Sequence, residues 1–266
     1  MYKLSNNWRG NYPRDDYRIA VIGCGGTGGF VAEGLCRMLP DHLVVMLIDP
    51  DRVDERNLVR QNFYAGELGQ FKSQALAKRL SQKFNRRIAY FTSPISMLEA
   101  FPDVIIGCVD NGPARRDIAD KITRKYNPFG MFRGWWVDSG NERNFGQVLI
   151  GNHPASGLEE SFETKREICL ALPLPTEQRP ELLLTLPAAP ACADMDEQGP
   201  VINQCMASLV LEVVWRILVG TCSWMQLNLD MEMGTLAPVL ATPENVSAIT
   251  GIKVKSLTFV ESKGRR

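Results

Sequence analysis

Stretches of almost uninterrupted apolar residues alternate with stretches of helical spacing along the first half of the chain. Residues 18–22 (RIAVI), 43–48 (LVVMLI) and 103–109 (DVIIGCV) are almost entirely apolar, which is typical of buried strands in a parallel sheet covered on both faces. Residues 27–38 and 72–84 carry apolar side chains three and four positions apart, which predicts amphipathic helices. The pattern therefore predicts a Rossmann-like α/β fold, a doubly wound and mostly parallel sheet with helices on both faces.

The pattern continues less regularly beyond these elements. Residues 113–126 predict another helix, and residues 135–137 and 147–150 predict further strands. Residues 203–219 (NQCMASLVLEVVWRILV) predict a strongly apolar helix. Such a helix fits either the core of the protein or a position partly buried in a subunit interface. The tail alternates polar and apolar residues in patches, 224–232 and 254–261 being the clearest, which predicts extra C-terminal strands.

A change of composition separates these two regions. Between Leu158 and Gln198 there are nine acidic residues, three basic residues and five prolines, and periodicity is weak. We expect a long crossing loop here, with at most one short helix near residues 159–169. Loops of this length in compact proteins are usually functional or disordered.

Composition and charge narrow the class of protein. The 266 residues are 45% hydrophobic and 23% charged, which is ordinary for a globular protein. The 30 basic and 30 acidic side chains give no net charge, which argues against nucleic-acid binding through a whole-molecule field. No apolar run reaches the ~20 residues of a membrane span, and the N-terminus shows no signal-peptide pattern. We expect a cytoplasmic protein without nucleic-acid or membrane partners.

Cysteine and histidine usage argues against disulfides and zinc. The seven cysteines are odd in number and no two of them form CxxC, so neither a disulfide framework nor a structural zinc site is expected. The two histidines offer little for a metal site or a catalytic triad. Cys24, Cys108 and Cys205 lie in predicted loop, strand and helix segments, and we expect Cys24 to be structural and the other two to belong to the core.

A glycine-rich loop, GCGGTGG at 23–29, follows strand 18–22 and opens helix 27–38. It contains GxGxxG in the strand–turn–helix context that this motif requires. Glycines let backbone N–H groups approach phosphate, and the helix N-terminus favours an anion. Asp49 ends the next strand, 21 residues after Gly28, and an acidic residue at that spacing binds ribose hydroxyls. The loop predicts an adenine-nucleotide site without distinguishing NAD, FAD and ATP.

Basic residues farther along the chain favour ATP. Arg60 precedes and Lys72 opens the predicted helix 72–84. Hydride transfer gives no reason to place two cations near the loop, whereas a triphosphate does, because negative charge builds up as pyrophosphate leaves. Asp110 and Asn111 end strand 103–109, at the edge of the sheet where ligands bind. A carboxylate there suits Mg²⁺, which prefers one or two carboxylates plus phosphate oxygens.

Four of these motifs, in this order, resemble those of the ThiF/MoeB and ubiquitin-activating-enzyme superfamily. They are GCGGTGG, IDPDRVDERNLVRQ (48–61), GQFK (69–72) and VDN (109–111) with Arg115 following. The similarity continues through SGNERNFGQVLI (139–150) and 192–220, and the size is closest to the stand-alone bacterial ThiF-like proteins. The resemblance implies an ATP-dependent adenylyltransferase that activates a C-terminal carboxylate. It also implies a single adenylation domain with an N-terminal arm (1–17), a nucleotide-binding core (18–150), a crossing loop (151–200), and an apolar helix with C-terminal strands (201–266).

The resemblance also implies roles for individual residues. The loop glycines surround the nucleotide phosphates, Asp49 binds ribose, and Asp51 lies beside the reacting phosphate. Lys72 neutralises the triphosphate, and Asp110 is the Mg²⁺ ligand. The residues expected at the nucleotide are Gly23, Gly25, Gly26, Gly28, Asp49, Asp51, Asn57, Arg60, Gln61, Lys72 and Asn111, and those expected to act in catalysis are Arg60, Lys72, Asp110 and Cys192.

Cys192 is the position that matches a sulfur- or thioester-transferring cysteine in some relatives. It is therefore either a nucleophile or a spectator thiol. Relatives often hold zinc with two CxxC pairs, which this chain lacks, so no zinc is expected. Relatives also often send an arginine to the partner subunit's ATP, and Arg9 and Arg14 are the counterparts here. A homodimer is the expectation from the family.

Two other functional classes share part of this pattern. An NAD(P)- or FAD-dependent oxidoreductase shares the loop and Asp49 but leaves Arg60, Lys72 and Asp110 unexplained. A non-catalytic scaffold of the same fold would not need the complete set of motif residues. For the adenylyltransferase, the expected partner is a small ubiquitin-like or sulfur-carrier protein with a Gly-Gly tail, and a peptide or a modified nucleoside is an alternative acceptor.

Overall fold

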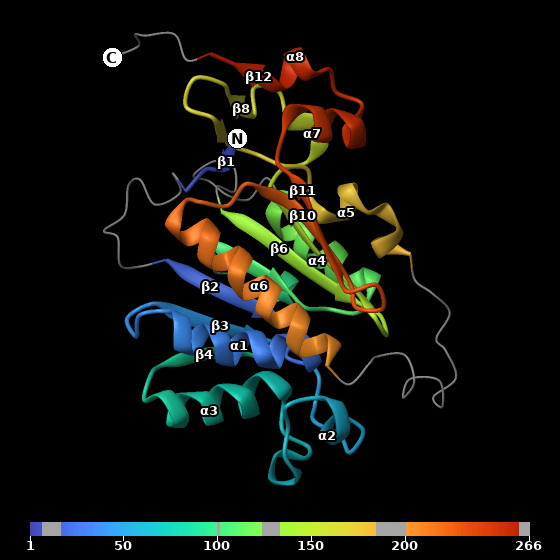
Figure 1. The fold of residues 1–266 in the computed structure, drawn as a ribbon. Coiled ribbons are helices and arrows are strands. Elements are labelled where there is room, and N and C mark those ends of the chain that lie inside the picture. Colours follow the sequence, from blue (N-terminus) through green and yellow to red (C-terminus); the bar gives the residue numbers. More distant parts are fainter. Residues whose placement is uncertain (7–16, 100–101, 124–133, 185–200, 261–266) are drawn as a thin grey trace.

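The computed structural model describes residues 1–6, 17–99, 102–123, 134–184 and 201–260. Its centre is an eight-stranded sheet with the strand order β11-β10-β7-β6-β5-β2-β3-β4 (Figure 1). The strands of this sheet are β2 (Arg18–Ile22), β3 (Val44–Ile48), β4 (Ile88–Phe91), β5 (Val104–Gly107), β6 (Trp135–Asn141), β7 (Phe145–Gly151), β10 (Trp224–Asp230) and β11 (Thr235–Leu240).

The sheet has a parallel part and an antiparallel part. Strands β6, β5, β2, β3 and β4 pair in parallel, and strands β7, β10 and β11 extend the sheet in antiparallel pairs. The central strands are buried on both faces because their side chains are apolar at every position, as in β5. This architecture confirms the predicted α/β class with C-terminal strands added to the sheet.

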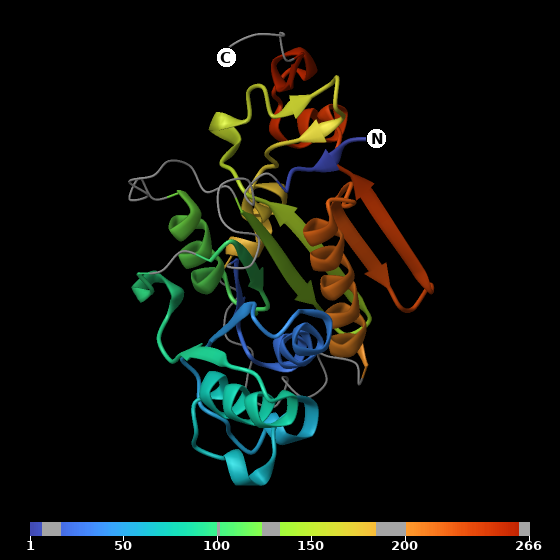
Figure 2. The same ribbon diagram turned by 90° about the vertical axis from the view of Figure 1, so that its left-hand side faces the viewer.

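Helices cover both faces of the sheet (Figures 1 and 2). Helices α1, α3 and α6 supply buried side chains to one apolar cluster, and α4 supplies them to a second cluster on the opposite face. The helical segments are α1 (Gly26–Met38), α2 (Asn57–Arg60), α3 (Lys72–Phe84), α4 (Gly112–Thr123), α5 (Pro175–Gln178), α6 (Ile202–Val219), α7 (Pro243–Thr250), α8 (Val254–Leu257) and the 3₁₀ turns η2 (Ala65–Glu67), η3 (Ile95–Met97), η4 (Ala155–Gly157) and η5 (Pro180–Leu183).

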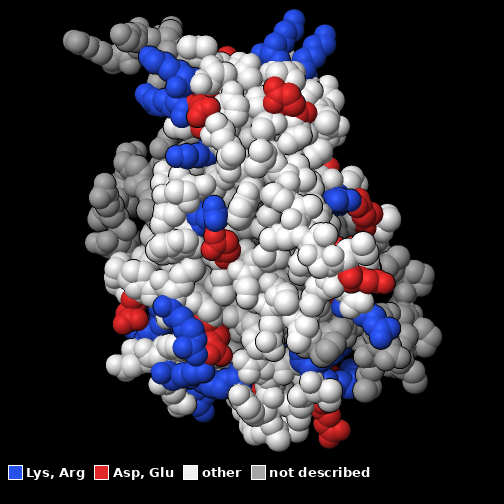
Figure 3. All heavy atoms as spheres, viewed as in Figure 1, with Lys and Arg blue, Asp and Glu red and all other residues white. Residues whose placement is uncertain are grey.

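The apolar helix α6 packs against α1, β6 and β7. Among the described helices it alone has the length and hydropathy of a membrane span, and half of that window is buried inside the structure. Its other side carries exposed Trp215 and Val219. Figure 3 shows that much of the surface in this view is uncharged, with basic and acidic side chains scattered over it. The helix thus contributes to the core and also leaves apolar side chains at the surface.

Two segments do not have the expected secondary structure. The stretch 159–169, expected to be loop with at most one short helix, contains the two-residue strands β8 (Phe162–Glu163) and β9 (Ile168–Cys169). The segment 254–261 was expected to form a strand, but its described residues, 254–260, form helix α8 and only a short strand, β12 (Thr258–Phe259). These strands and β1 (Lys3–Leu4) form a second sheet in the order β1-β9-β8-β12.

The reason for both errors is that this small sheet joins segments far apart in the sequence. β9 pairs with β1, and β8 pairs with β12. Strands of two residues carry no recognisable alternation of polar and apolar side chains. The region 151–184 is therefore partly ordered by tertiary contacts, with Leu158, Phe162 and Leu172 fully buried.

A buried arginine joins the end of α1 to the sheet. The Arg86 guanidinium lies just before β4 and donates hydrogen bonds to the carbonyl oxygens of Cys36, Leu39, Pro40 and Leu43, at 2.9–3.3 Å. The last carbonyls of a helix have no partner within the helix. Arg86 therefore caps α1 and holds the connection between α1 and β3 against the sheet.

Arg86→Ala is expected to lower the free energy of unfolding by at least about 3 kcal/mol, because each buried carbonyl left without a donor costs ~1–3 kcal/mol. Arg86→Lys should recover only part of this, because an ammonium group lacks the planar fork of donors. The matched control is Arg87→Ala, since Arg87 is exposed and its loss should change stability by no more than about 0.5 kcal/mol. Urea denaturation measures all three, and equal stability of the two alanine variants would contradict this account of Arg86.

Candidate active site

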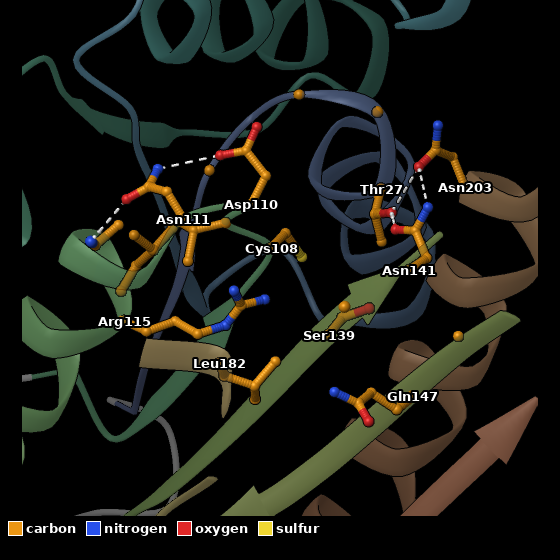
Figure 4. A pocket seen from close by; sticks show the side chains of 18 of the residues that line it. Thr27, Cys108, Asp110, Asn111, Arg115, Ser139, Asn141, Gln147, Leu182 and Asn203 are labelled. Atoms are coloured by element: carbon orange, nitrogen blue, oxygen red, sulfur yellow. Dashed lines mark hydrogen bonds between the residues drawn. The ribbon is translucent and has the colours of Figure 1, made fainter. Parts of the chain in front are cut away.

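A cavity of about 1000 Å³ opens at the carboxyl ends of the parallel strands. Residues that follow β2, β3 and β5 line one side of it, and residues of β6, β7, β10 and β11 line the other. In α/β sheets ligands bind outside the carboxyl ends of the strands. Figure 4 shows side chains from α1, α4, β6, β7 and α6 converging on this space.

The glycine loop between β2 and α1 leaves no room for side chains at two positions. A Cβ atom on Gly28 would lie 1.8 Å from the carbonyl oxygen of Gly23, and one on Gly23 would lie 2.5 Å from that of Cys108. Gly23 also has a φ of +85°, a value that favours glycine. The loop then enters α1, whose N-terminus has no side-chain cap. The first N–H groups of this helix are therefore available to an anion.

The predicted ribose-binding residue, Asp49, is also the anchor of the loop. Its carboxylate accepts hydrogen bonds from the backbone N–H of Cys24 at 2.6 Å and from that of Asp51 at 2.8 Å. Burial raises the pKa of the Asp49 carboxyl, and these two hydrogen bonds act against that rise. The carboxylate lines the cavity, and each of its oxygens keeps a further lone pair for a ligand.

Lys72 and Asp51 form an ion pair at the edge of the cavity. Lys72 Nζ lies 3.1 Å from Asp51 Oδ2, and the lysine side chain is 10% exposed while the aspartate is 67% exposed. Arg60 and Gln61 line the cavity close by in sequence, at the end of α2. Gln61 Oε1 is buried and has no hydrogen-bond partner among the described residues. A bound molecule that donates a hydrogen bond would satisfy it.

Asp110 and Asn111 follow β5 and lie on the cavity wall. Asn111 donates a hydrogen bond from Nδ2 to Asp110 Oδ1 at 3.1 Å, and its Oδ1 accepts one from the backbone N–H of Ala114 at the start of α4. The Asp110 carboxylate is exposed to the cavity. Within the described part of the chain no three His, Cys, Asp or Glu side chains form a metal-binding group. One carboxylate that faces a cavity able to receive phosphate groups nevertheless fits the way in which Mg²⁺ binds, with phosphate oxygens as its other ligands.

Three polar side chains meet at the start of α1. Thr27 Oγ1 lies 2.9 Å from Asn203 Oδ1 and 3.2 Å from Asn141 Oδ1, and Asn141 Nδ2 lies 3.4 Å from Asn203 Oδ1 (Figure 4). A Cβ atom on Gly26 would lie 2.5 Å from the Asn203 amide nitrogen. This cluster joins α1, β6 and α6, and it fixes the side of the glycine loop that faces β6.

A buried ion pair lies between α4 and β6. Arg115 Nε donates to Asp138 Oδ2 at 2.9 Å, with the side chains 5% and 1% exposed. Burial raises the pKa of Asp138 to about 6, and Arg115 limits this rise. Asp138 Oδ1 has no hydrogen-bond partner in the described structure. The pair orients the Arg115 guanidinium, which reaches the cavity.

The structure brings most of the predicted site residues together. Asn57 is buried and does not line the cavity. Its Oδ1 accepts a hydrogen bond from the backbone N–H of Asp54, and its own backbone N–H donates to Asp54 Oδ1. Gly28 supports the turn behind the loop. Cys192, Arg9 and Arg14 lie outside the described residues. The predicted residues that line the cavity are Gly23, Gly25, Gly26, Asp49, Asp51, Arg60, Gln61, Lys72, Asp110 and Asn111.

Other polar residues of the cavity had no predicted role. They come from the ends of β6 and β7 and from α1, α4 and α6. One available signal was the set of polar residues at the end of the apolar strand 135–137, since that end of a parallel strand faces the ligand crevice. The cavity residues without a predicted role include Thr27, Arg115, Ser139, Asn141, Gln147 and Asn203.

The cysteines differ partly from expectation. Cys24 is buried and burial raises its pKa well above the usual range, as expected for a structural thiol. Cys108 packs against the core but is only partly buried, and it lines the cavity. Cys205 is also only partly buried. Both were expected to belong to the core, and of the two Cys108 packs against it.

The sequence is similar to two eukaryotic activating enzymes. It is 27% identical over 215 residues to adenylyltransferase and sulfurtransferase UBA4 of Yarrowia lipolytica, which covers 77% of this chain and 47% of that protein. It is 27% identical over 201 residues to ubiquitin-like modifier-activating enzyme 5 of Oryza sativa subsp. japonica, which covers 62% of this chain and 45% of that protein. The chain therefore spans about half the length of these relatives.

Solved structures share the fold. E. coli MccB with ATP matches with a TM-score of 0.57 at 14% identity, over 84% of this chain and 63% of that one. PaaA matches with a TM-score of 0.56 at 18% identity, over 84% and 64%. The sequence profile of the ThiF family matches residues 14–238, which include every element from β2 to β10. With its glycine loop, Asp49, Lys72 and Asp110 around one cavity, the chain belongs to the ThiF family.

Proposed function

We propose that this protein is an ATP-dependent adenylyltransferase that activates the C-terminal carboxylate of a second molecule and releases pyrophosphate. The observation that carries the proposal is the combination, around one cavity, of an uncapped helix N-terminus, two cationic side chains and an exposed carboxylate. Family membership supports it, and so do the activities for which the two relatives are named.

The cavity has room for two substrates. Asp49, Lys72 and the glycine loop lie on the side of β2 and β3, where a nucleotide would bind. Gln147, Asn228 and Ala237 line the side of β7, β10 and β11, beyond the nucleotide residues. A cavity of about 1000 Å³ is at the upper end of the usual range for small-molecule sites. We assign the second side to the acceptor.

The reaction needs positioning and charge more than proton transfer. A carboxylate oxygen attacks the α-phosphorus of ATP, the bond from that phosphorus to the bridging oxygen breaks, and the electron pair leaves with pyrophosphate. The acceptor is already ionised at neutral pH, so no general base is needed. Lys72 and Arg60 offset the charge that builds up on the leaving group, and Asp51 holds the lysine in place.

Asp110 is the residue that would hold Mg²⁺. When bound, the ion supplies a further positive charge to the phosphate oxygens. The Asn111 amide holds the Asp110 carboxylate from one side. The other carboxylate oxygen is left for a ligand in the cavity.

The acceptor we propose is a small ubiquitin-like or sulfur-carrier protein with a Gly-Gly tail. Two relatives are named for sulfur transfer and for activation of a ubiquitin-like modifier, and a solved MccB structure contains the peptide MccA. Homodimer formation and a cytoplasmic location stay predictions.

The direct test is the exchange of labelled pyrophosphate into ATP in the presence of candidate acceptors that end in Gly-Gly. The proposal expects exchange that depends on both the acceptor and ATP. An absorbance change of added NADH or NADPH, without exchange, would support the oxidoreductase instead. Absence of both activities across the acceptors would favour a non-catalytic scaffold.

Lys72→Ala should lower the exchange rate about 10²–10³-fold, because a donor that stabilises charge in the transition state is lost. The matched control is Lys78→Ala on the same helix, where the side chain is exposed and faces away from the cavity. Thermal melting of both variants separates folding from catalysis. Exchange by a folded Lys72→Ala variant within a few-fold of wild type would contradict the role of this lysine.

Asp110→Asn should raise the Mg²⁺ concentration needed for half-maximal exchange by at least about tenfold, since even outer-shell partners contribute about 10–100-fold to metal affinity. Chelation with EDTA should abolish exchange by the wild type. Asp120→Asn, at an exposed position on α4, is the control. An unchanged Mg²⁺ requirement in Asp110→Asn would show that another group holds the ion.

Cys192→Ala should keep pyrophosphate exchange and abolish any thiol-sensitive adduct between protein and acceptor, because a thiolate is the nucleophile for such transfer. Cys205→Ala is the control and should affect stability alone. Mass spectrometry after denaturation detects the adduct. If the Cys192→Ala variant still forms it, the nucleophile is another cysteine.

A further inference from the structure

The cavity wall carries no side chain at Gly140, near the carboxyl end of β6. A Cβ atom placed on Gly140 would lie 3.4 Å from Arg115 Nη2, 3.7 Å from Gln147 Nε2 and 3.9 Å from Gln147 Cγ, its three nearest neighbours. Gly140, Arg115 and Gln147 all line the cavity. Two nitrogen donors on different elements, α4 and β7, therefore lie beside one glycine of the cavity wall.

The antiparallel pairing of β6 and β7 explains this geometry. Gly140 lies directly opposite Gln147 in the register of the two strands, so their side-chain positions share one face. Asp138 lies two residues before Gly140 and shares this face. It holds Arg115 through Nε at 2.9 Å. The ion pair thus fixes the guanidinium, which extends toward the space bounded by Cys108, Ser139 and Leu182 in Figure 4.

Among the described residues, the terminal nitrogens of Arg115 and the Gln147 amide have no hydrogen-bond partner. The Arg115 side chain is 5% exposed, and in the described part of the chain its one hydrogen bond is that from Nε to Asp138. Asp138 already balances the charge of Arg115. A guanidinium that is held in place in this way, with terminal donors that reach a cavity, fits a ligand oxygen such as that of a carboxylate.

The position of this point separates it from Asp49, the predicted ribose-binding residue. In the sheet order, β6 is three strands away from β3, which ends at Asp49, whereas β5, which leads to Asp110 and Asn111, is its neighbour. Three strand spacings are about 14 Å. A nucleotide whose ribose is bound at Asp49 would have to direct its α-phosphate, and the acyl group joined to it, along the strand ends to reach this point. A ligand oxygen beside Gly140 would then lie beyond the ribose, where the acyl group joins the phosphate.

We propose that Arg115 and Gln147 bind the reacting carboxylate of the acceptor in the space that Gly140 leaves open. This assignment rests on the proposed adenylyltransferase function and names the residues that orient its second substrate. One carboxylate oxygen accepts hydrogen bonds from Arg115 and Gln147, and the other is left to attack the α-phosphorus. The bond to phosphorus forms as pyrophosphate leaves, and the bound oxygen becomes the carbonyl oxygen of the acyl-adenylate.

The test compares two synthetic ligands that differ only in the acyl group. Adenosine 5′-sulfamate carries the nucleoside and a phosphate mimic, and its N-glycyl derivative adds the acyl carbonyl of an acyl-adenylate. Isothermal titration calorimetry on the full chain gives both dissociation constants without a known acceptor. The wild type should bind the glycyl derivative at least about tenfold more tightly, the range expected for hydrogen bonds to a charged group.

Three variants probe the space and one serves as control. Gly140→Ala fills it with a methyl group in ordinary van der Waals contact, and Gln147→Leu removes one donor. Arg115→Lys keeps a cation beside Asp138, so that no buried charge is left unpaired. Each should lose most of the preference for the glycyl derivative and bind adenosine 5′-sulfamate within about twofold of wild type. Arg116→Gln, at an exposed position on α4, should behave as wild type.

The outcomes separate this inference from the proposed function. Tight binding of both ligands by wild type, with no preference for the glycyl derivative, would overturn the inference and leave ATP binding intact. An equal loss of both ligands in the Gly140→Ala and Arg115→Lys variants would overturn it too, by assigning the site to the nucleotide phosphates. If the wild type binds neither ligand, the proposed function fails and the inference fails with it.

Discussion

The carboxyl ends of β2 and β5 meet at a point where there is no room for a single methyl group. A Cβ atom on Gly28 would clash with the carbonyl oxygen of Gly23, and one on Gly23 would clash with the carbonyl oxygen of Cys108. Any side chain at either position would push the loop away from β5. This steric constraint places the N-terminus of α1 directly above the strand ends, and the rest of the candidate site is arranged around that helix terminus.

The Asp49 carboxylate completes this arrangement and links fold to function. It accepts one hydrogen bond from the backbone N–H of Cys24 in the glycine loop and another from the backbone N–H of Asp51, two residues farther along the chain. Ser73 on α3 reaches the carbonyl oxygen of Asp49 at 2.9 Å. The same residue therefore connects β2, β3 and α3, in addition to its proposed contact with ribose. Substitution of Asp49 would disturb the phosphate loop and the nucleotide contact together, so Lys72 and Asp110 are cleaner positions at which to test the chemistry.

The sequence predicted the parts of the molecule that depend on local pattern. Apolar runs and helical spacing predicted β2, β3, β5, α1, α3 and α6, and their observed bounds differ from the predicted ones by at most two residues. The cavity residues of the glycine loop were predicted from a motif whose geometry depends on neighbouring residues alone. The small sheet was not predicted, because β8 and β9 pair with β12 and β1, which lie far away in the sequence. Asn57 was expected in the cavity, but its amide is used to hold the turn at Asp54.

The part of the site on β6 and β7 depends on strand register, which the sequence does not display. The turn between β6 and β7 sets Gly140 opposite Gln147. A slip of one residue would place the Gln147 side chain on the other face of the sheet. Arg115 reaches the same point only because Asp138, on that face of β6, holds its Nε. A parallel Rossmann sheet offers a nucleotide site at its strand ends, and in our proposal Gln147 of the antiparallel hairpin beside it, together with Arg115 of α4, holds the carboxylate of the second substrate. The proposed carboxylate site therefore depends on the register of β6 and β7, whereas the proposed ATP site depends on the glycine loop.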